Sequence, residues 1–177
     1  MDPDFDDAAL AIWSPRLLLD PSKPEDADDL FVVLDDERLH EFIGGSPATL
    51  DELRRRYRRW SARRSPDGRD LWLNWVLRLR DTRRPIGTLQ TTVSRDVAAV
   101  AWVVGRPWQG RGYATEAARA LVAWLVDDLH VRSVVAHVHP QHRASAKVAE
   151  HVGLEATDET VDGEVVWRLR ADGTKTG

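Results

Sequence analysis

The sequence contains no cysteine, a single methionine, two tyrosines and three phenylalanines among its 177 residues. The absence of cysteine excludes disulfides, a cysteine nucleophile, iron–sulfur clusters and thiolate zinc sites. No stretch approaches the ~20 consecutive apolar residues that a membrane-spanning helix needs. The first residues are acidic, whereas a secretory leader begins with positive charge, so we expect a cytoplasmic protein.

The composition is that of an ordinary globular protein, with 42% hydrophobic and 31% charged residues. The length predicts a single domain over residues 1–177, in which residues 1–14 are a flexible N-terminal extension. A net charge of −4 argues against a general nucleic-acid binder. The exception is a local run of seven arginines between positions 54 and 64.

The pattern of apolar residues predicts a mixed α/β (α+β) sheet with helices between its strands. The strand over 97–104 is apolar on both faces, which predicts a place in the middle of the sheet. Helices are predicted after Pro24, after a capping box of Thr49 and Glu52, over 113–129 and over 144–152. The other predicted strands cover residues 16–20, 71–80, 86–94, 133–139 and 164–170.

The most informative segment is the glycine loop (residues 105–112), which joins the strand over 97–104 to the long helix. Glycines between a buried strand and a helix N-terminus let backbone N–H groups converge on an anion, assisted by the helix dipole. The loop therefore predicts a phosphate or pyrophosphate ligand. Arg111 and Gly112 replace the Lys-Ser/Thr of a Walker A motif, and the third glycine of a Rossmann fingerprint is missing.

The run Gln109-Gly110-Arg111-Gly112-Tyr113-Ala114 resembles the pyrophosphate loop of the GNAT family of acyl-CoA N-acyltransferases, Q/R-x-x-G-x-G/A. Residues 140–154 resemble the second signature of the family branch related to ribosomal-protein N-terminal acetyltransferases. Residues 15–19 and 24–27 resemble the beginning of that branch. The resemblance covers nearly the whole chain. It implies the GNAT fold, in which helices flank a central mixed, mostly antiparallel sheet.

The resemblance implies acetyl-CoA as cosubstrate and no metal. It also implies that the strand ending at Val104 parts from the strand over 133–139 and pairs its backbone with the pantetheine arm. A backbone N–H near Val104 would then meet the thioester oxygen as negative charge develops there. His142 stands where the family usually has an asparagine that bonds this arm. The residues implied for the cofactor are Val103, Val104, Gln109, Gly110, Arg111, Gly112, Tyr113, Ala114, Thr115, His142 and Ser145.

Two proton transfers need a side chain or water. Ser145 stands where the branch places a hydroxyl that protonates the leaving thiolate. The attacking amine must be neutral, so a base or a chain of waters must accept a proton. His137 and His139, on one side of their strand, and Glu116, in the long helix, are the candidate bases, with water as the alternative.

The acceptor side is predicted from the early part of the chain. Trp72 and Asn74 lie on the more polar face of the strand over 71–80 and are predicted to line the acceptor pocket. The arginine helix is predicted to be a solvated face held by the i,i+4 pairs Asp51–Arg55 and Glu52–Arg56. The alternative is that it attracts an acidic substrate, a peptide or RNA.

The sequence thus predicts an N-acetyltransferase that moves an acetyl group from acetyl-CoA to a primary amine by direct attack in a ternary complex. The amine belongs to a small molecule or to a protein N-terminus. Two alternatives remain: a non-catalytic acyl-CoA-binding or sensing module, and an RNA-directed acyl transferase that uses the Arg54–Arg64 helix. The acceptor, the acyl-chain length and the oligomeric state stay open.

Overall fold

The computed structural model describes residues 7–42 and 44–171. Its helices are α1 (Asp7–Leu10), α2 (Asp26–Leu34), α3 (Leu50–Trp60), α4 (Tyr113–Asp127) and α5 (Arg143–His151), with short 3-10 helices η1 (Glu37–His40) and η2 (Arg106–Trp108). Its strands are β1 (Ile12–Trp13), β2 (Leu17–Pro21), β3 (Asp70–Leu79), β4 (Pro85–Ser94), β5 (Val97–Val104), β6 (Ser133–Val138), β7 (Glu155–Val161) and β8 (Glu164–Arg170).

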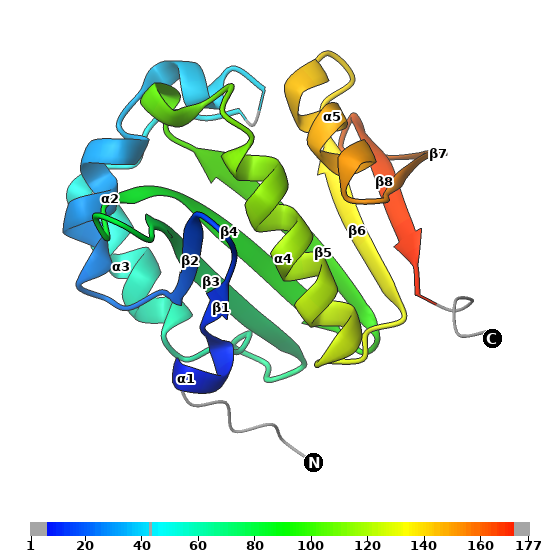
Figure 1. Ribbon diagram of the computed structural model, residues 1–177, viewed down its shortest axis with the longest axis horizontal. Helices are drawn as coiled ribbons and strands as arrows, with labels where there is room; N and C mark the ends of the chain where they lie inside the picture. The colour runs from blue at the N-terminus through cyan, green and yellow to red at the C-terminus, as the bar shows by residue number, and fades with distance from the viewer. Residues whose placement is uncertain (1–6, 43, 172–177) are drawn as a thin grey trace.

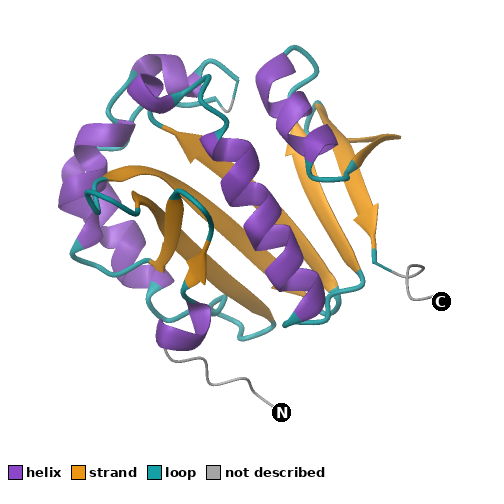
Figure 2. Cartoon of the chain, viewed as in Figure 1, coloured by secondary structure: helices purple, strands orange, loops and turns teal. Residues whose placement is uncertain are grey.

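All of these strands join one eight-stranded sheet in the order β1-β2-β3-β4-β5-β6-β8-β7 (Figures 1 and 2). Strands β5 and β6 run parallel, and the other neighbouring strands in this sheet run antiparallel. The predicted fold class, a mixed and mostly antiparallel sheet flanked by helices, is therefore confirmed.

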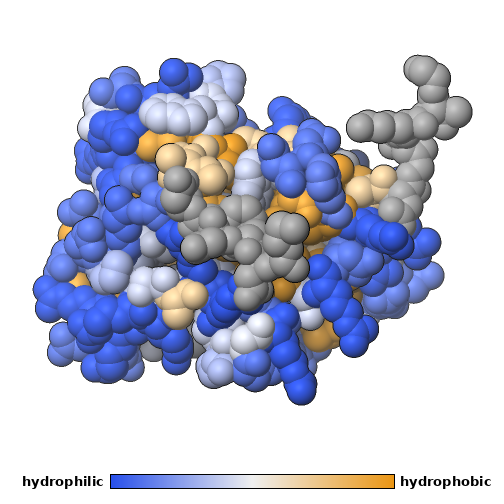
Figure 3. Space-filling model, turned by 90° about the horizontal axis from the view of Figure 1, so that it is seen from below, coloured by the Kyte–Doolittle hydropathy of each residue, from blue (hydrophilic) through white to orange (hydrophobic). Residues whose placement is uncertain are grey.

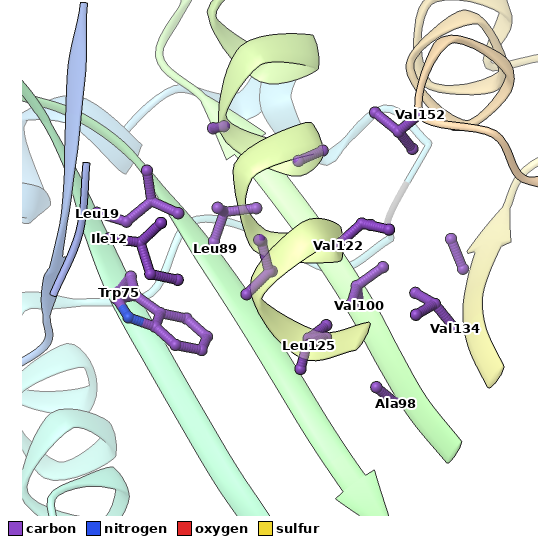
Figure 4. Packing of buried hydrophobic residues seen from close by; sticks show 14 of the residues in the cluster. Ile12, Leu19, Trp75, Leu89, Ala98, Val100, Val122, Leu125, Val134 and Val152 are labelled. Carbon is purple, nitrogen blue, oxygen red and sulfur yellow. The ribbon is translucent and has the colours of Figure 1, made fainter. Parts of the chain in front are cut away.

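Helix α4 lies across one face of the sheet and carries the main core. Its residues Leu121 and Leu125 are fully buried because apolar positions occupy most of the helix circumference. Figure 4 shows Leu125 and Val122 among side chains of the central strands, including Val100 and Val134. This packing fixes the N-terminus of α4 relative to the end of β5.

Helices α2 and α3 pack on the opposite face, over β3 and β4, around a second cluster that includes Leu30, Leu53 and Tyr57. The capping box of Thr49 and Glu52 is present at the start of α3. Strand β5 is central, as its pattern predicts, but its face on this side is partly open, with Val97 38% exposed. The predicted central position is therefore confirmed, although the helices on this side do not cover the beginning of β5.

Residues 7–14 correct the prediction of a flexible extension, whereas residues 1–6 lie outside the described part of the chain. Leu10 and Ile12 are buried, and β1 pairs with β2. The indole Nε1 of Trp75 donates a hydrogen bond to the carbonyl oxygen of Leu10 at 2.8 Å. The segment is too short for its apolar residues to show a helical or strand period, so these contacts could not be predicted from sequence.

Strand β7 was also missed. It is an edge strand whose residues are almost all exposed, so it has no apolar alternation to detect. The available signal was the Asp-Gly pair before β8: Asp162 and Gly163 have φ values of 52° and 83°, the left-handed conformation of a tight hairpin turn.

No helix among the described residues is long and apolar enough to cross a membrane. The view from below (Figure 3) shows a mostly hydrophilic surface, with hydrophobic residues exposed mainly toward its middle.

Candidate active site

Strands β5 and β6 separate shortly after they begin. Their pairing covers only Val97–Ala99 opposite Ser133–Val135, and beyond this the two strands part (Figure 1). The Gly105 N–H donates to the Ile86 carbonyl at 2.8 Å at the end of the β4–β5 ladder. Hydrogen-bonded pairs alternate in an antiparallel ladder, so the N–H of Val104 turns toward the β6 side. The opening is thus bordered by strand backbone without a strand partner.

The glycine loop leads from this opening into α4. Gly110 and Gly112 have φ values of +72° and +78°, which favour glycine, and Gly112 caps α4 without a side chain. The first-turn N–H groups of α4, on Tyr113, Ala114 and Thr115, have no intrahelical acceptors. A Cβ added to Gly110 would meet nothing within 4 Å, so the loop surface is open there. This arrangement can hold an anionic phosphate group.

Glu116 fixes the first turn of α4 to the beginning of the chain. Its carboxylate accepts hydrogen bonds from the Ser14 hydroxyl (2.7 Å), the Arg16 N–H (2.7 Å) and the Arg16 Nε (2.6 Å). Burial alone would raise the pKa of Glu116, but these donors and the charge of Arg16 outweigh burial and lower it. A carboxylate with three donors and a lowered pKa is a poor proton acceptor. The structure therefore favours a role for Glu116 in anchoring the first turn of α4, and not a role as the base.

Arg16 also holds the glycine loop from outside. Its guanidinium donates to the Arg111 carbonyl at 3.0 Å and lies 4.5 Å from the centre of the Tyr113 ring. The Gln109 side-chain amide donates to the Val104 carbonyl at 2.9 Å. The Gln109 side chain, implied by resemblance to meet the pyrophosphate, thus ties the loop to β5. The Arg111 side chain is exposed.

A second helix N-terminus, that of α5, follows the end of β6. His142 is its N-cap: Nδ1 accepts a hydrogen bond from the Ser145 N–H at 3.4 Å. Burial lowers the pKa of His142, and the neighbouring His139 lowers it further, so the ring is neutral at pH 7. The Ser145 hydroxyl is partly exposed and makes no hydrogen bond to the described residues, so it is free to act on a ligand.

The His142 ring also contacts the segment after η1. It stacks on Phe42 with ring centroids 4.5 Å apart and an interplanar angle of 24°. His139 lies 5.5 Å from the same Phe42 ring. These contacts connect the segment after η1 to the turn between β6 and α5.

The two strand histidines differ in their surroundings. Nδ1 of His139 accepts the Gln141 N–H at 3.2 Å, so in the neutral ring Nε2 carries the proton. His139 must break this turn hydrogen bond to accept a proton at Nδ1, which makes it a weak candidate base. His137 is exposed. Among the described residues, no group of three or more His, Asp or Glu side chains is placed to hold a metal ion.

A pocket of about 130 Å³ lies between α2, η1, α3 and the sheet, and we call it the α2–α3 pocket. Val103 of β5 lines it, which places the pocket at the strand end that borders the β5–β6 opening. Thr88 and Gln90 of β4 lie on the same sheet face. The remaining lining residues are Phe31, Leu34, Asp35, Leu39, His40, Ser46, Ala48, Leu53 and Arg56.

The predicted acceptor residues lie outside the α2–α3 pocket. Trp72 and Asn74 line a separate, much smaller hollow near Trp60 and Arg63. They do share a sheet face with the α2–α3 pocket, since Asn74 is the register partner of Gln90. On β4, the pocket-lining Thr88 and Gln90 flank the apolar Leu89, so strand alternation was the available signal for this polar face.

The arginine helix is largely a solvated face, but its ion pairs differ from the predicted ones. Arg54 pairs with Asp28 of α2 and lies 3.8 Å from Asp51. The Glu52 carboxylate instead accepts hydrogen bonds from Thr49 in the capping box. The side chains of Arg55, Arg56, Arg58 and Arg59 are exposed.

Several solved structures with this arrangement are acetyltransferases. A GNAT-family acetyltransferase from Bacillus anthracis superposes with a TM-score of 0.76 at 16% identity, covering 92% of this chain and 99% of that one. A putative ribosomal-protein-serine acetyltransferase from Vibrio cholerae gives 0.72 at 18%, covering 96% and 99%. The aminoglycoside acetyltransferase AAC(6')-Ib, solved with coenzyme A, gives 0.70 at 21%, covering 88% and 94%.

Sequence comparison defines the family. Residues 16–155 match the model of the acetyltransferase (GNAT) domain. The chain therefore belongs to the GNAT acetyltransferase family, as its motifs indicated. A search of curated protein sequences found no match.

Proposed function

We propose that this protein transfers an acetyl group from acetyl-CoA to a primary amine by direct attack within a ternary complex. The observation that carries the proposal is a juxtaposition at one strand end. The β5–β6 opening runs along one edge of β5, and the glycine loop follows the end of this strand. The α2–α3 pocket lies on one face of the sheet at the same strand end, where Val103 lines it. An activated acyl group and an amine can thus meet at the end of β5.

The cofactor side fits acetyl-CoA. The glycine loop and the first turn of α4 present backbone N–H groups for a pyrophosphate. The unpaired edge of β5 offers N–H and C=O groups to the amides of the pantetheine arm. His142, with Nδ1 used in the cap, keeps Nε2–H as a donor, the hydrogen-bonding role that asparagine has in related proteins. Acetyl-CoA supplies the thioester that makes the acetyl group reactive.

Each group around the reacting atoms has one role in the transfer. The Val104 N–H stabilises negative charge on the thioester oxygen. The amine nitrogen forms the new C–N bond as the C–S bond breaks, and the leaving thiolate accepts a proton from the Ser145 hydroxyl. The proton released by the amine passes to water, because Glu116 and His139 are occupied by other donors, and water returns a proton to the Ser145 oxygen. A chain without cysteine has no thiol to carry the acetyl group, which supports direct attack.

Titration calorimetry with acetyl-CoA tests the cofactor side. Gly110→Asp places a carboxylate where the pyrophosphate binds, and Gly110→Asn is the matched control because both residues tolerate a positive φ. We expect Gly110→Asp to bind at least ~10-fold more weakly than Gly110→Asn, the effect of about 1.4 kcal/mol of repulsion. Equal affinities would place the pyrophosphate elsewhere.

Release of free thiol from acetyl-CoA in the presence of amines tests transfer itself. We expect Ser145→Ala to lower kcat about 100-fold, the lower end of the range for a proton-transferring side chain, with a smaller effect on acetyl-CoA binding. Binding of acetyl-CoA without amine-dependent thiol release would instead support the non-catalytic binding module.

A further inference from the structure

The α2–α3 pocket carries charges of opposite sign at its two ends. Val33 of α2 lies beside Gly105, so the C-terminal end of α2 is next to the end of β5, and Asp35 follows there as the C-cap. Helix α3 packs on β3, which is two strands from β5, and Arg56 enters the pocket from α3. The acidic end is therefore the one closer to the β5–β6 opening.

Arg56 is available to a ligand. Its sequence neighbour Glu52 is held by Thr49, and Arg56 makes no ion pair within the described residues. Its guanidinium lies 5.8 Å from the centre of the Trp60 ring. The exposed Arg55 and Arg59 lie on the same helix but do not line the pocket. A second positive charge on a ligand would be repelled at this end, and a negative one attracted.

The middle of the pocket is mostly apolar. Phe31, Leu34, Leu39 and Leu53 line it, while Thr88 and Gln90 provide hydroxyl and amide groups on the sheet side. A volume of about 130 Å³ suits a short hydrocarbon chain and not a large ring system.

We propose that the α2–α3 pocket binds an amine whose far end carries a carboxylate, with a short apolar chain between the two. The inference rests on the proposed function for its orientation: the reacting amino group lies near Asp35 and Val103, and the carboxylate lies at Arg56. The acceptor is thus an amino acid with a distant carboxylate, or a peptide N-terminus followed by an acidic side chain. Polycationic amines are poor ligands of this pocket.

Three acceptors with the same number of carbon atoms test the proposal. They are 6-aminohexanoate, hexylamine and 1,6-diaminohexane, which end in a carboxylate, a methyl group and an ammonium group, respectively. Thiol release should give kcat/KM in that order, with 6-aminohexanoate about five-fold above hexylamine, the size of a partly exposed ion pair. Arg56→Gln should remove this preference through KM. Arg59→Gln, an exposed arginine of the same helix outside the pocket lining, should keep it. A preference for the diamine, or a preference unchanged in Arg56→Gln, overturns the proposal.

Calorimetric binding of 6-aminohexanoate in the presence of coenzyme A separates this proposal from the proposed function. Binding that weakens in Arg56→Gln but not in Arg59→Gln supports the pocket assignment even if no thiol is released, in which case only the transferase function fails. Absence of both binding and turnover, for 6-aminohexanoate and for peptides with glutamate as second residue, overturns the pocket assignment. Turnover of the glutamate peptide alone, several-fold above its glutamine counterpart, identifies a peptide acceptor.

Discussion

The glycine loop and the α2–α3 pocket differ in how far apart their residues lie in the chain. The loop and the first turn of α4 are one continuous segment, residues 105–116, and in the proposed function they bind a ligand through backbone N–H groups. The pocket collects side chains from α2, η1, α3, β4 and β5, so its lining extends along the chain from Phe31 to Val103. A backbone site depends on local conformation, whereas a side-chain pocket depends on how helices pack on a sheet.

The glycine loop also depends on tertiary structure, because residues far away in the sequence hold it in place. Arg16 and Ser14 bind Glu116, and Arg16 also reaches the Arg111 carbonyl and the Tyr113 ring. In the other direction, Phe42 follows η1, which lines the pocket, and stacks on the cap of α5. The two regions are therefore coupled at identified contacts.

Glu116→Gln should have the largest effect on this coupling. The amide of glutamine removes the charge that pairs with Arg16 and turns a donor toward other donors. We expect a loss of about 2–3 kcal/mol in the free energy of unfolding, measured by urea denaturation. Acetyl-CoA binding should weaken more than amine binding in the α2–α3 pocket.

The pH dependence of Glu116 gives a second readout. The pKa of Glu116 is lowered in the folded protein, so this carboxylate stabilises the fold above its ordinary pKa, and the contribution is lost as the pH falls through the lowered value. The difference in stability between wild type and Glu116→Gln should accordingly shrink as the pH falls below about 4.5. A difference that stays constant with pH would mean that the carboxylate charge has no part in holding α4.

His142→Ala should have an intermediate effect at the other helix N-terminus. Loss of the cap should cost about 1 kcal/mol, and His142→Asn should restore most of it, since asparagine is a good N-cap. The pKa of His142 is lowered, so the unfolded chain takes up a proton first, and wild-type stability should fall as the pH drops below ~6.5. His142→Asn should lack this fall, and equal acid sensitivity in both proteins would contradict the assignment of the cap.

Thr91→Val should have the smallest effect and serves as the control for the comparison. The Thr91 hydroxyl is buried in the sheet and has no hydrogen-bond partner within the described residues. Replacing it with a methyl group should raise the free energy of unfolding by about 0.5–1 kcal/mol. The substitution touches neither region, so acetyl-CoA and amine affinities should stay at wild-type values. A change in either affinity would show that ligand binding depends on the stability of the core, even when no residue of the site is altered.

The sequence by itself determined the features that depend on neighbouring residues. The capping box of Thr49 and Glu52, the long helix after Gly112 and the alternating strands follow from local hydrogen bonding and from periods of 3.6 and 2. The glycine loop was predictable for the same reason, because positive φ values and free N–H groups are properties of consecutive residues. The family followed from these motifs taken in order.

Only the tertiary structure decided which side chains meet. Trp72 and Asn74 share a sheet face with Gln90, yet the packing of α2 and α3 puts the pocket at Thr88, Gln90 and Val103 instead. The capture of Glu116 by Arg16, one hundred residues away, likewise has no local signature. Burial and ion pairing between distant segments depend on where helices pack on the sheet, and that position is set by the sum of many weak contacts.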